Sequence, residues 1–142
     1  MEKAERKELV NSAFQGIYGK EPEVWVRAPG RVDLMGSHTD YNMGYVMTMP
    51  ISRDLWIAAA PADPERWNGQ DAGRPDIRLY SLNLEETAEI YIRELRKTSG
   101  WADYPAGVAS VLLEAGHGVQ GFDAVIHSTI PMGSGLSSSA AI

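Results

Sequence analysis

"FDAVIHSTIPMGSGLSSSAAI", residues 122–142, combines three local patterns whose order indicates the fold. Residues 122–130 predict a strand, and the serines and alanines of 137–142 predict the start of a helix. Gly133 and Gly135 lie between them and predict a tight turn, because a glycine backbone adopts positive φ without steric cost. Backbone N–H groups at such a turn are free to bind an anion, and hydroxyls beside them can ligand Mg²⁺. The stretch therefore predicts a phosphate-binding loop, with a plain glycine turn capped by serine as the alternative.

The glycine spacing of this loop excludes two common nucleotide motifs. The Walker pattern GxxxxGK[ST] and its lysine are absent, and no third glycine completes the GxGxxG dinucleotide fingerprint. By itself the loop indicates phosphate binding and does not identify a ligand.

Apolar periodicity along the rest of the chain predicts further helices and strands. Leu9, Val10 and Phe14 recur at helical spacing. Pro50 indicates a break between two strands or a position at a sheet edge, because proline cannot donate a hydrogen bond to a sheet. Prolines and glycines make 61–75 an expected exposed loop. The predicted helices cover 3–18 and 104–115, and the predicted strands cover 23–29, 44–51, 54–60, 76–82 and 88–92.

This order of elements predicts an α+β domain with a mixed or antiparallel sheet and helices on one face. The length of 142 residues suits one domain rather than two. The sequence stops one turn into a predicted helix, which has no room to bury an apolar face. We therefore expect residues 1–142 to form an incomplete domain.

Composition and charge exclude several classes of partner and chemistry. The chain has no cysteine, which rules out thiol catalysis, disulfides and thiolate metal sites and agrees with a cytoplasmic location. The net charge of −6 argues against nucleic-acid and anionic-membrane partners, because both favour basic surfaces. The charged N-terminus is no signal peptide, and no apolar run approaches the ~18 residues of a membrane span. ATP binding is compatible with this acidity, since backbone amides and a metal hold nucleotide phosphates.

A second polar cluster, "GRVDLMGSHTDYNMG" at residues 30–44, places arginine, aspartates, histidine and hydroxyls between glycines. A solvated loop can have this composition, with Arg31 and Asp33 as a weak surface pair and Asp40 as a turn residue. A pocket for a polyhydroxylated ligand needs the same residue types, because sugar recognition takes several directional donors and acceptors at once. The residues alone leave both interpretations open.

Taken together, three segments resemble the galactokinase branch of the GHMP small-molecule kinase family. "APGRVDLMGSHTDYNMG" (28–44) is similar to the galactokinase signature, "IPMGSGLSSSAAI" (130–142) to the family's phosphate loop, and "WADYPAGV" (101–108) to the segment between them. The resemblance implies the GHMP kinase N-terminal domain, a fold shared with a ribosomal-protein domain. It also implies transfer of the γ-phosphoryl of Mg·ATP to the anomeric hydroxyl of a sugar, either galactose or a galacto-configured relative.

The resemblance also implies roles for individual residues. Arg31 is implied as the catalytic residue beside the transferring phosphoryl and the sugar C1 hydroxyl, where phosphoryl transfer requires charge neutralisation. Ser37, His38 and Asp40 are implied to bind the sugar hydroxyls. The nucleotide phosphates are implied to lie on Gly133, Ser134, Gly135, Leu136, Ser137, Ser138 and Ser139, with Ser139 as the Mg²⁺ ligand and Trp101 near the adenine.

Two positions depart from the galactokinase pattern, which has asparagine where this chain has Asp33 and glutamate where it has Ser37. In the family, that glutamate is expected to bind a hydroxyl at the far end of galactose. A serine weakens binding of a hydroxymethyl sugar, because a hydrogen bond to a charged acceptor contributes ~1.5–3 kcal/mol. It also relieves repulsion of a sugar carboxylate. We therefore hypothesise a pentose such as L-arabinose or a uronic acid such as galacturonate, and the GRVDLMG form also resembles the plant L-arabinokinase motif.

The resemblance covers only the N-terminal part of such an enzyme. The catalytic aspartate of galactokinases, the third family motif and the C-terminal domain follow the phosphate loop in the family. We therefore expect little or no kinase activity from this chain alone, and self-association through apolar faces that the missing half would cover. The alternatives are a non-catalytic sugar- and ATP-binding regulatory module and an inactive fragment.

Overall fold

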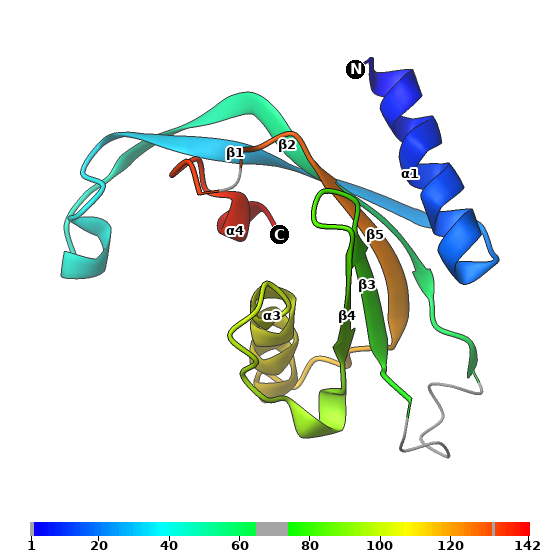
Figure 1. Cartoon of the computed structure of the whole chain (residues 1–142). Coiled ribbons are helices and arrows are strands. Elements are labelled where there is room, and N and C mark those ends of the chain that lie inside the picture. The colour runs from blue at the N-terminus through cyan, green and yellow to red at the C-terminus, as the bar shows by residue number, and fades with distance from the viewer. Residues whose placement is uncertain (1, 65–73, 132) are drawn as a thin grey trace. The chain divides into compact units, whose positions relative to one another are not determined.

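A computed structural model describes residues 2–64, 74–131 and 133–142. These residues form a five-stranded mixed sheet with a few helices, in the strand order β1-β2-β5-β3-β4 (Figure 1). The prediction of an α+β fold with a mixed sheet is confirmed. The elements are, in chain order, α1 (Lys3–Tyr18), β1 (Val24–Met35), the 3₁₀ turn η1 (Asp40–Asn42), β2 (Met47–Pro61), β3 (Ile77–Ser81), β4 (Glu86–Ile90), the 3₁₀ turn η2 (Ile92–Glu94), α3 (Asp103–Glu114), β5 (Phe122–Ser128) and α4 (Ser138–Ala141).

Two compact units divide the described residues. The first unit contains the chain up to Val26 together with Ile57–His127. The second contains Arg27–Trp56 together with Ser128–Ile142. The long strands β1 and β2 each contribute residues to both units.

α1 packs its apolar stripe on the sheet of the first unit. Val10 and Phe14 are fully buried in a core cluster with residues of β2 and β5, including Val125. The predicted helix 3–18 is confirmed, and the two residues share a face because they lie four positions apart. Gly19 ends the helix with a φ of 69°. Neither α1 nor any other helix in the described ranges is long and apolar enough to cross a membrane.

β3 accounts for the mixed character of the sheet. It pairs antiparallel with β4, where Ile77 lies opposite Ile90, and parallel with β5, where Ile77 lies opposite Phe122. A hairpin can join antiparallel neighbours, whereas a parallel neighbour needs a longer crossover. The connection between the parallel neighbours β3 and β5 contains β4, η2 and α3.

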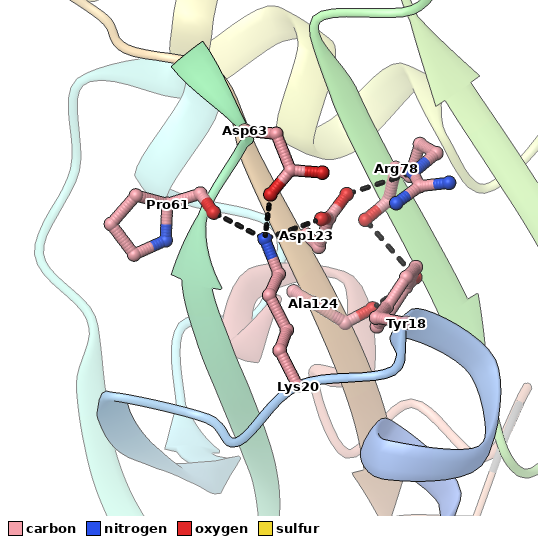
Figure 2. A network of polar contacts seen from close by, with 7 residues as sticks. All are labelled: Tyr18, Lys20, Pro61, Asp63, Arg78, Asp123 and Ala124. Atoms are coloured by element: carbon pink, nitrogen blue, oxygen red, sulfur yellow. Dashed lines mark hydrogen bonds and ion pairs between the residues drawn. The ribbon is translucent and has the colours of Figure 1, made fainter. Parts of the chain in front are cut away.

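A buried carboxylate ties three parts of the first unit together (Figure 2). Asp123 of β5 is fully buried, and its carboxylate lies 2.8 Å from Arg78 Nε and 3.0 Å from Lys20 Nζ. Lys20 also lies 3.6 Å from the exposed carboxylate of Asp63. The hydrogen bond to Asp123 raises the pKa of Arg78 above its ordinary value. The two cations compensate a buried charge that would otherwise be costly.

The predicted break at Pro50 was wrong. β2 runs unbroken from Met47 to Pro61, so the predicted strands 44–51 and 54–60 form a single strand. Pro50 is the fourth residue of this strand. A proline is accommodated in a strand where the neighbouring strand does not need its N–H.

The ends of two other strands differ from the predicted ends. β1 continues to Met35, past the predicted end at residue 29, so residues 30–35 of the polar cluster are strand rather than loop. β4 covers Glu86–Ile90 instead of 88–92. Residues 65–73 of the predicted loop lie outside the described residues.

Candidate functional site

The predicted phosphate loop forms a backbone nest in the second unit. The φ angle is positive at Gly133, Gly135 and Ser137, with values of 68°, 73° and 62°, and is not positive at Ser134 and Leu136 between them. Alternation of this kind turns successive N–H groups toward one side and makes an anion-binding concavity. A Cβ built on Gly133 or Gly135 would meet nothing within 4 Å. These glycines therefore serve the backbone angle rather than close packing.

The N–H groups of this nest are available to a ligand. Among the described residues, no backbone N–H from Gly133 to Ser137 donates a hydrogen bond to the protein. The Ser134 hydroxyl donates to Pro131 O at 2.6 Å and closes the turn. Ser137 occupies the N-cap position of α4, yet its side chain makes no capping hydrogen bond. A plain serine-capped turn therefore does not describe this loop.

Hydrogen bonds join the nest to the polar cluster at 30–44. Arg31 N donates to Leu136 O at 3.1 Å, and the Ser137 hydroxyl donates to Arg31 O at 3.3 Å. Gly30 permits this approach, because a Cβ there would lie 3.0 Å from Leu136 O and 3.2 Å from Ile130 Cδ1. Arg31 and Ser137 are 106 positions apart in the sequence. The fold thus brings the two predicted motifs into direct contact.

A shallow cavity of about 260 Å³ lies where the two motifs meet. Complete small-molecule pockets usually measure about 300–1,000 Å³, so this cavity suits a phosphate group or one part of a larger ligand. β2 contributes Thr48 and Pro50, which the sequence interpretation missed. Their spacing of two residues on a strand, which places them on one face, is the signal that could have found them. The lining residues are Pro29, Gly30, Arg31, Thr48, Pro50, Ser137, Ala140 and Ala141.

The side chain of Arg31 pairs with Asp33 on the same face of β1. Arg31 Nε lies 3.4 Å from Asp33 Oδ1, and the two side chains are 45% and 25% exposed. Asp33 Oδ1 is buried and has no hydrogen-bond partner among the described residues. The contact is therefore an ion pair without a hydrogen bond. The Nη groups of Arg31, which form the fork that binds phosphate, make no ion pair or hydrogen bond within the described chain.

The loop between β1 and β2 holds the predicted sugar-binding residues, with η1 at its tip (Figure 1). Gly36 turns the chain with a φ of 88°. The Thr39 hydroxyl lies within hydrogen-bond distance of Gly36 O at 2.9 Å and Tyr45 O at 2.7 Å, which fixes the turn. His38 Nδ1 lies 2.8 Å from the Tyr41 hydroxyl. The imidazole is therefore oriented by its neighbour in the loop.

The predicted sugar-binding residues are less fully placed than the nest. Ser37 and His38 are exposed, and among the described residues no hydrogen bond or ion pair joins either side chain to Arg31 or to the nest. Asp40 begins η1, and its side chain lies outside what the structure describes. The imidazole Nε2 of His38 makes no hydrogen bond within the described chain and can accept or donate to a ligand hydroxyl.

The hydroxyls near the nest suit a magnesium ion that nucleotide phosphates already hold. Ser134 and Ser137 use their hydroxyls in hydrogen bonds to the protein, whereas Ser138 and Ser139 do not within the described chain. Mg²⁺ retains several waters and takes few protein ligands beside substrate phosphates. Ser139 is exposed in the first turn of α4 and fits the predicted role. The described residues contain no cluster of three acidic or imidazole side chains able to hold a metal unaided.

Trp101 belongs to the first unit, where it precedes α3 and is half-buried. Asp103 fixes the start of α3, because its carboxylate accepts hydrogen bonds from Thr98 N and Ser99 N at 2.8 Å and from the Thr98 hydroxyl at 2.7 Å. These bonds, the one from Thr98 N foremost, hold the pKa of Asp103 below its usual value. The role of Trp101 beside an adenine stays a prediction.

Two family models match the chain. The galactokinase galactose-binding signature matches residues 12–61, which contain β1, η1 and β2. The GHMP kinase N-terminal domain matches residues 103–142, which contain α3, β5 and the nest. Arg31 lies within the first matched range and Leu136 within the second. The hydrogen bond between them therefore joins the two matched segments.

Relatives and solved structures agree with these models. The galactokinase of Roseiflexus sp. (strain RS-1) is 42% identical over 129 residues, covering 91% of this chain and 31% of that protein. The galactokinase of Streptomyces coelicolor is 42% identical over 137 residues, covering 94% and 33%. The crystal structure of Lactococcus lactis galactokinase complexed with galactose matches with a TM-score of 0.73 and 30% identity, over 96% of this chain and 34% of that one. The chain thus spans about a third of the length of these relatives.

Proposed function

Because the chain is a galactokinase-like N-terminal portion of the GHMP kinase family, we propose that it forms the phosphate-binding and sugar-binding side of an ATP-dependent sugar kinase. The nest Gly133–Ser137 binds the nucleotide phosphates in this role. Arg31 neutralises the phosphoryl group in transit to the sugar C1 hydroxyl.

The hydrogen-bonded contact between Arg31 and the nest carries this proposal. Phosphoryl transfer leaves the protein little covalent chemistry to perform, so positioning and charge neutralisation provide most of the catalysis. A nest of unengaged N–H groups supplies the first requirement, and the arginine anchored to Leu136 O at 3.1 Å supplies the second. Mg²⁺ bound with ATP adds further neutralisation, and Ser139 is the residue that would ligand it.

The sugar that we propose is galactose or a galacto-configured relative, with L-arabinose and galacturonate as the finer alternatives. The galactose named for the L. lactis complex supports the galacto configuration. Ser37 supports the alternatives, because an exposed hydroxyl in place of the family's glutamate neither binds a C6 hydroxymethyl group strongly nor repels a C6 carboxylate.

Phosphate binding can be tested with inorganic triphosphate and Mg²⁺ by titration calorimetry on the 142-residue chain. We expect Gly135→Val to weaken binding about tenfold or more, because a β-branched residue does not adopt the φ of 73° that the nest requires. Gly118→Val is the matched control, since Gly118 has no positive φ and open space at its Cβ position. Equal affinities for the two variants would refute the nest as the phosphate site.

Sugar preference can be tested by replacing Ser37 with glutamate and following sugar binding by ligand-detected NMR. We expect S37E to gain affinity for galactose and to lose affinity for galacturonate, because the new carboxylate accepts from a hydroxyl and repels an anion. An unchanged order among galactose, L-arabinose and galacturonate would refute the role of Ser37.

Turnover separates a kinase from a regulatory binding module. We expect little or no sugar 1-phosphate from the chain with Mg·ATP, measured by mass spectrometry, because it spans about a third of the related enzymes. Product from any sugar would contradict this expectation and identify the substrate directly.

Self-association is a further property that we propose, through the apolar stripe on α3. Val108 and Val111 of this stripe are 57% and 64% exposed. Exposed apolar side chains that gather on one face favour association. Sedimentation velocity should show a concentration-dependent mass that Val111→Lys abolishes, and a concentration-independent monomer would contradict this role.

A further inference from the structure

We propose that Asp33 acts through Arg31 and lowers the attraction of this arginine for a phosphate group. The inference rests on the proposed function, because it requires Arg31 to face the phosphoryl group. The galactokinase pattern has a neutral asparagine at this position. This chain therefore places an additional negative charge beside its phosphate-facing arginine.

The geometry shows that Asp33 acts on Arg31 through its charge. Asp33 Oδ1 lies 3.4 Å from Arg31 Nε and makes no hydrogen bond in the described chain. Because the contact is not a hydrogen bond, an uncharged amide of the same shape cannot reproduce it. Oδ1 is buried, and water screens a buried charge less than an exposed one. Asp33 thus offsets part of the positive charge that Arg31 presents.

Because Arg31 lies beside the nest, a reduction of its positive charge affects how tightly a phosphate binds there. Hydrogen bonds to Leu136 O and from the Ser137 hydroxyl fix the Arg31 main chain to the nest. A phosphate in the nest meets the N–H groups together with an arginine whose charge is partly compensated. Weaker retention of phosphate favours release of a phosphorylated product, a step that limits turnover in many enzymes.

The experiment compares Asp33→Asn with wild type for binding of inorganic triphosphate with Mg²⁺, by calorimetry at low and high salt. We expect D33N to bind about three- to tenfold more tightly, because removal of a nearby negative charge restores the attraction of Arg31. The gain should shrink as salt rises. Glu94→Gln is the matched control, since Glu94 is also paired with an arginine, Arg96 at 3.1 Å, but lies in the first unit. Its affinity should stay at the wild-type value.

NMR of the Arg31 Nε–H group, recorded without ligand, tests the pairing by itself. Its resonance should shift in D33N and remain in place in E94Q. If D33N does not fold, Asp33→Ser removes the same charge with a smaller side chain. Failure of both variants to fold would assign Asp33 to stability and overturn the inference.

The outcomes separate this inference from the proposed function. Wild-type binding of triphosphate with equal or weaker binding by D33N overturns the role of Asp33 and leaves the phosphate site standing. Absence of binding by both proteins overturns the phosphate site and the role of Asp33 together. If D33N binds triphosphate more tightly than wild type, if this gain shrinks as salt rises, and if E94Q shows no gain, the phosphate site and the role of Asp33 are both supported.

Discussion

Replacing Asp123 with asparagine removes the charge that holds Lys20 and Arg78 in the first unit (Figure 2). The amide preserves the shape of the side chain, so packing in the surrounding core changes little. The two cations then face each other across a neutral group. We expect the folded state to lose stability, because Arg78 loses the carboxylate that it pairs with and Lys20 keeps only the exposed carboxylate of Asp63.

The magnitude follows from the burial of the three side chains. Removing one partner of a buried ion pair costs about 3–5 kcal/mol. Asp123 is fully buried, but the side chains of Lys20 and Arg78 are 25% and 32% exposed, so water partly solvates the cations that remain. We therefore expect the free energy of unfolding to fall by about 3 kcal/mol, the lower end of that range. For a chain of this size the melting temperature should fall by about 10 °C.

Urea unfolding followed by circular dichroism measures this loss, with Asp63→Asn as the matched control. Asp63 contacts the same lysine at 3.6 Å, but its side chain is 73% exposed. An exposed pair contributes little, so D63N should cost less than about 0.5 kcal/mol. If D123N unfolds within about 1 kcal/mol of wild type, or D63N costs as much as D123N, the buried carboxylate does not organise this part of the fold.

Three further predictions concern the turn, the core and acid stability. Gly36→Ala should destabilise the chain by about 2 kcal/mol or more in urea unfolding, because φ is 88° and the added Cβ would lie 2.5 Å from Tyr45 O; an unchanged midpoint would refute this conformation. Phe14→Ala should cost about 3–5 kcal/mol in the same assay, since the ring is fully buried, and a cost near zero would show that α1 does not pack there. The pKa of Asp103 is lowered in the folded chain, chiefly by the hydrogen bond from Thr98 N. The contribution of Asp103 to folding stability is therefore fully present above the unfolded pKa of about 3.9, and it disappears as pH falls through the folded pKa. The melting temperature of D103N should therefore fall less between pH 6 and pH 3 than that of wild type, and equal slopes would contradict the assignment.

Elements with a local periodic signal were predictable from the sequence. The helix 3–18 follows from the spacing of Val10 and Phe14, which the core buries together. The break at Pro50 failed as a prediction because the effect of a proline depends on whether the neighbouring strand needs its N–H. That requirement is set by pairing across the sheet and leaves no local trace in the sequence.

The candidate site also contains features that were predictable from the sequence and features that were not. The glycines of the nest were predictable, since positive φ at Gly133 and Gly135 is a local property of the chain. The contact of Arg31 with Leu136 was not, because no pattern within either segment specifies a partner so distant in sequence. In the sequence, Arg31 and Asp33 have the spacing of a weak surface ion pair. The burial of Asp33 Oδ1, which the sequence does not reveal, distinguishes the observed contact from such a pair.

The hydrogen bond from Arg31 N to Leu136 O has main-chain atoms at both ends. No exchange of side chains at either position deletes it, except a proline at position 31, which would remove the donor. The side chains at positions 31 and 136 can therefore be diversified in a mutant library while the two segments remain attached, provided that Gly30 is kept, because a Cβ there would lie 3.0 Å from Leu136 O. Selection for a new sugar or a new phosphate donor could then start from variants that retain the geometry of the parent.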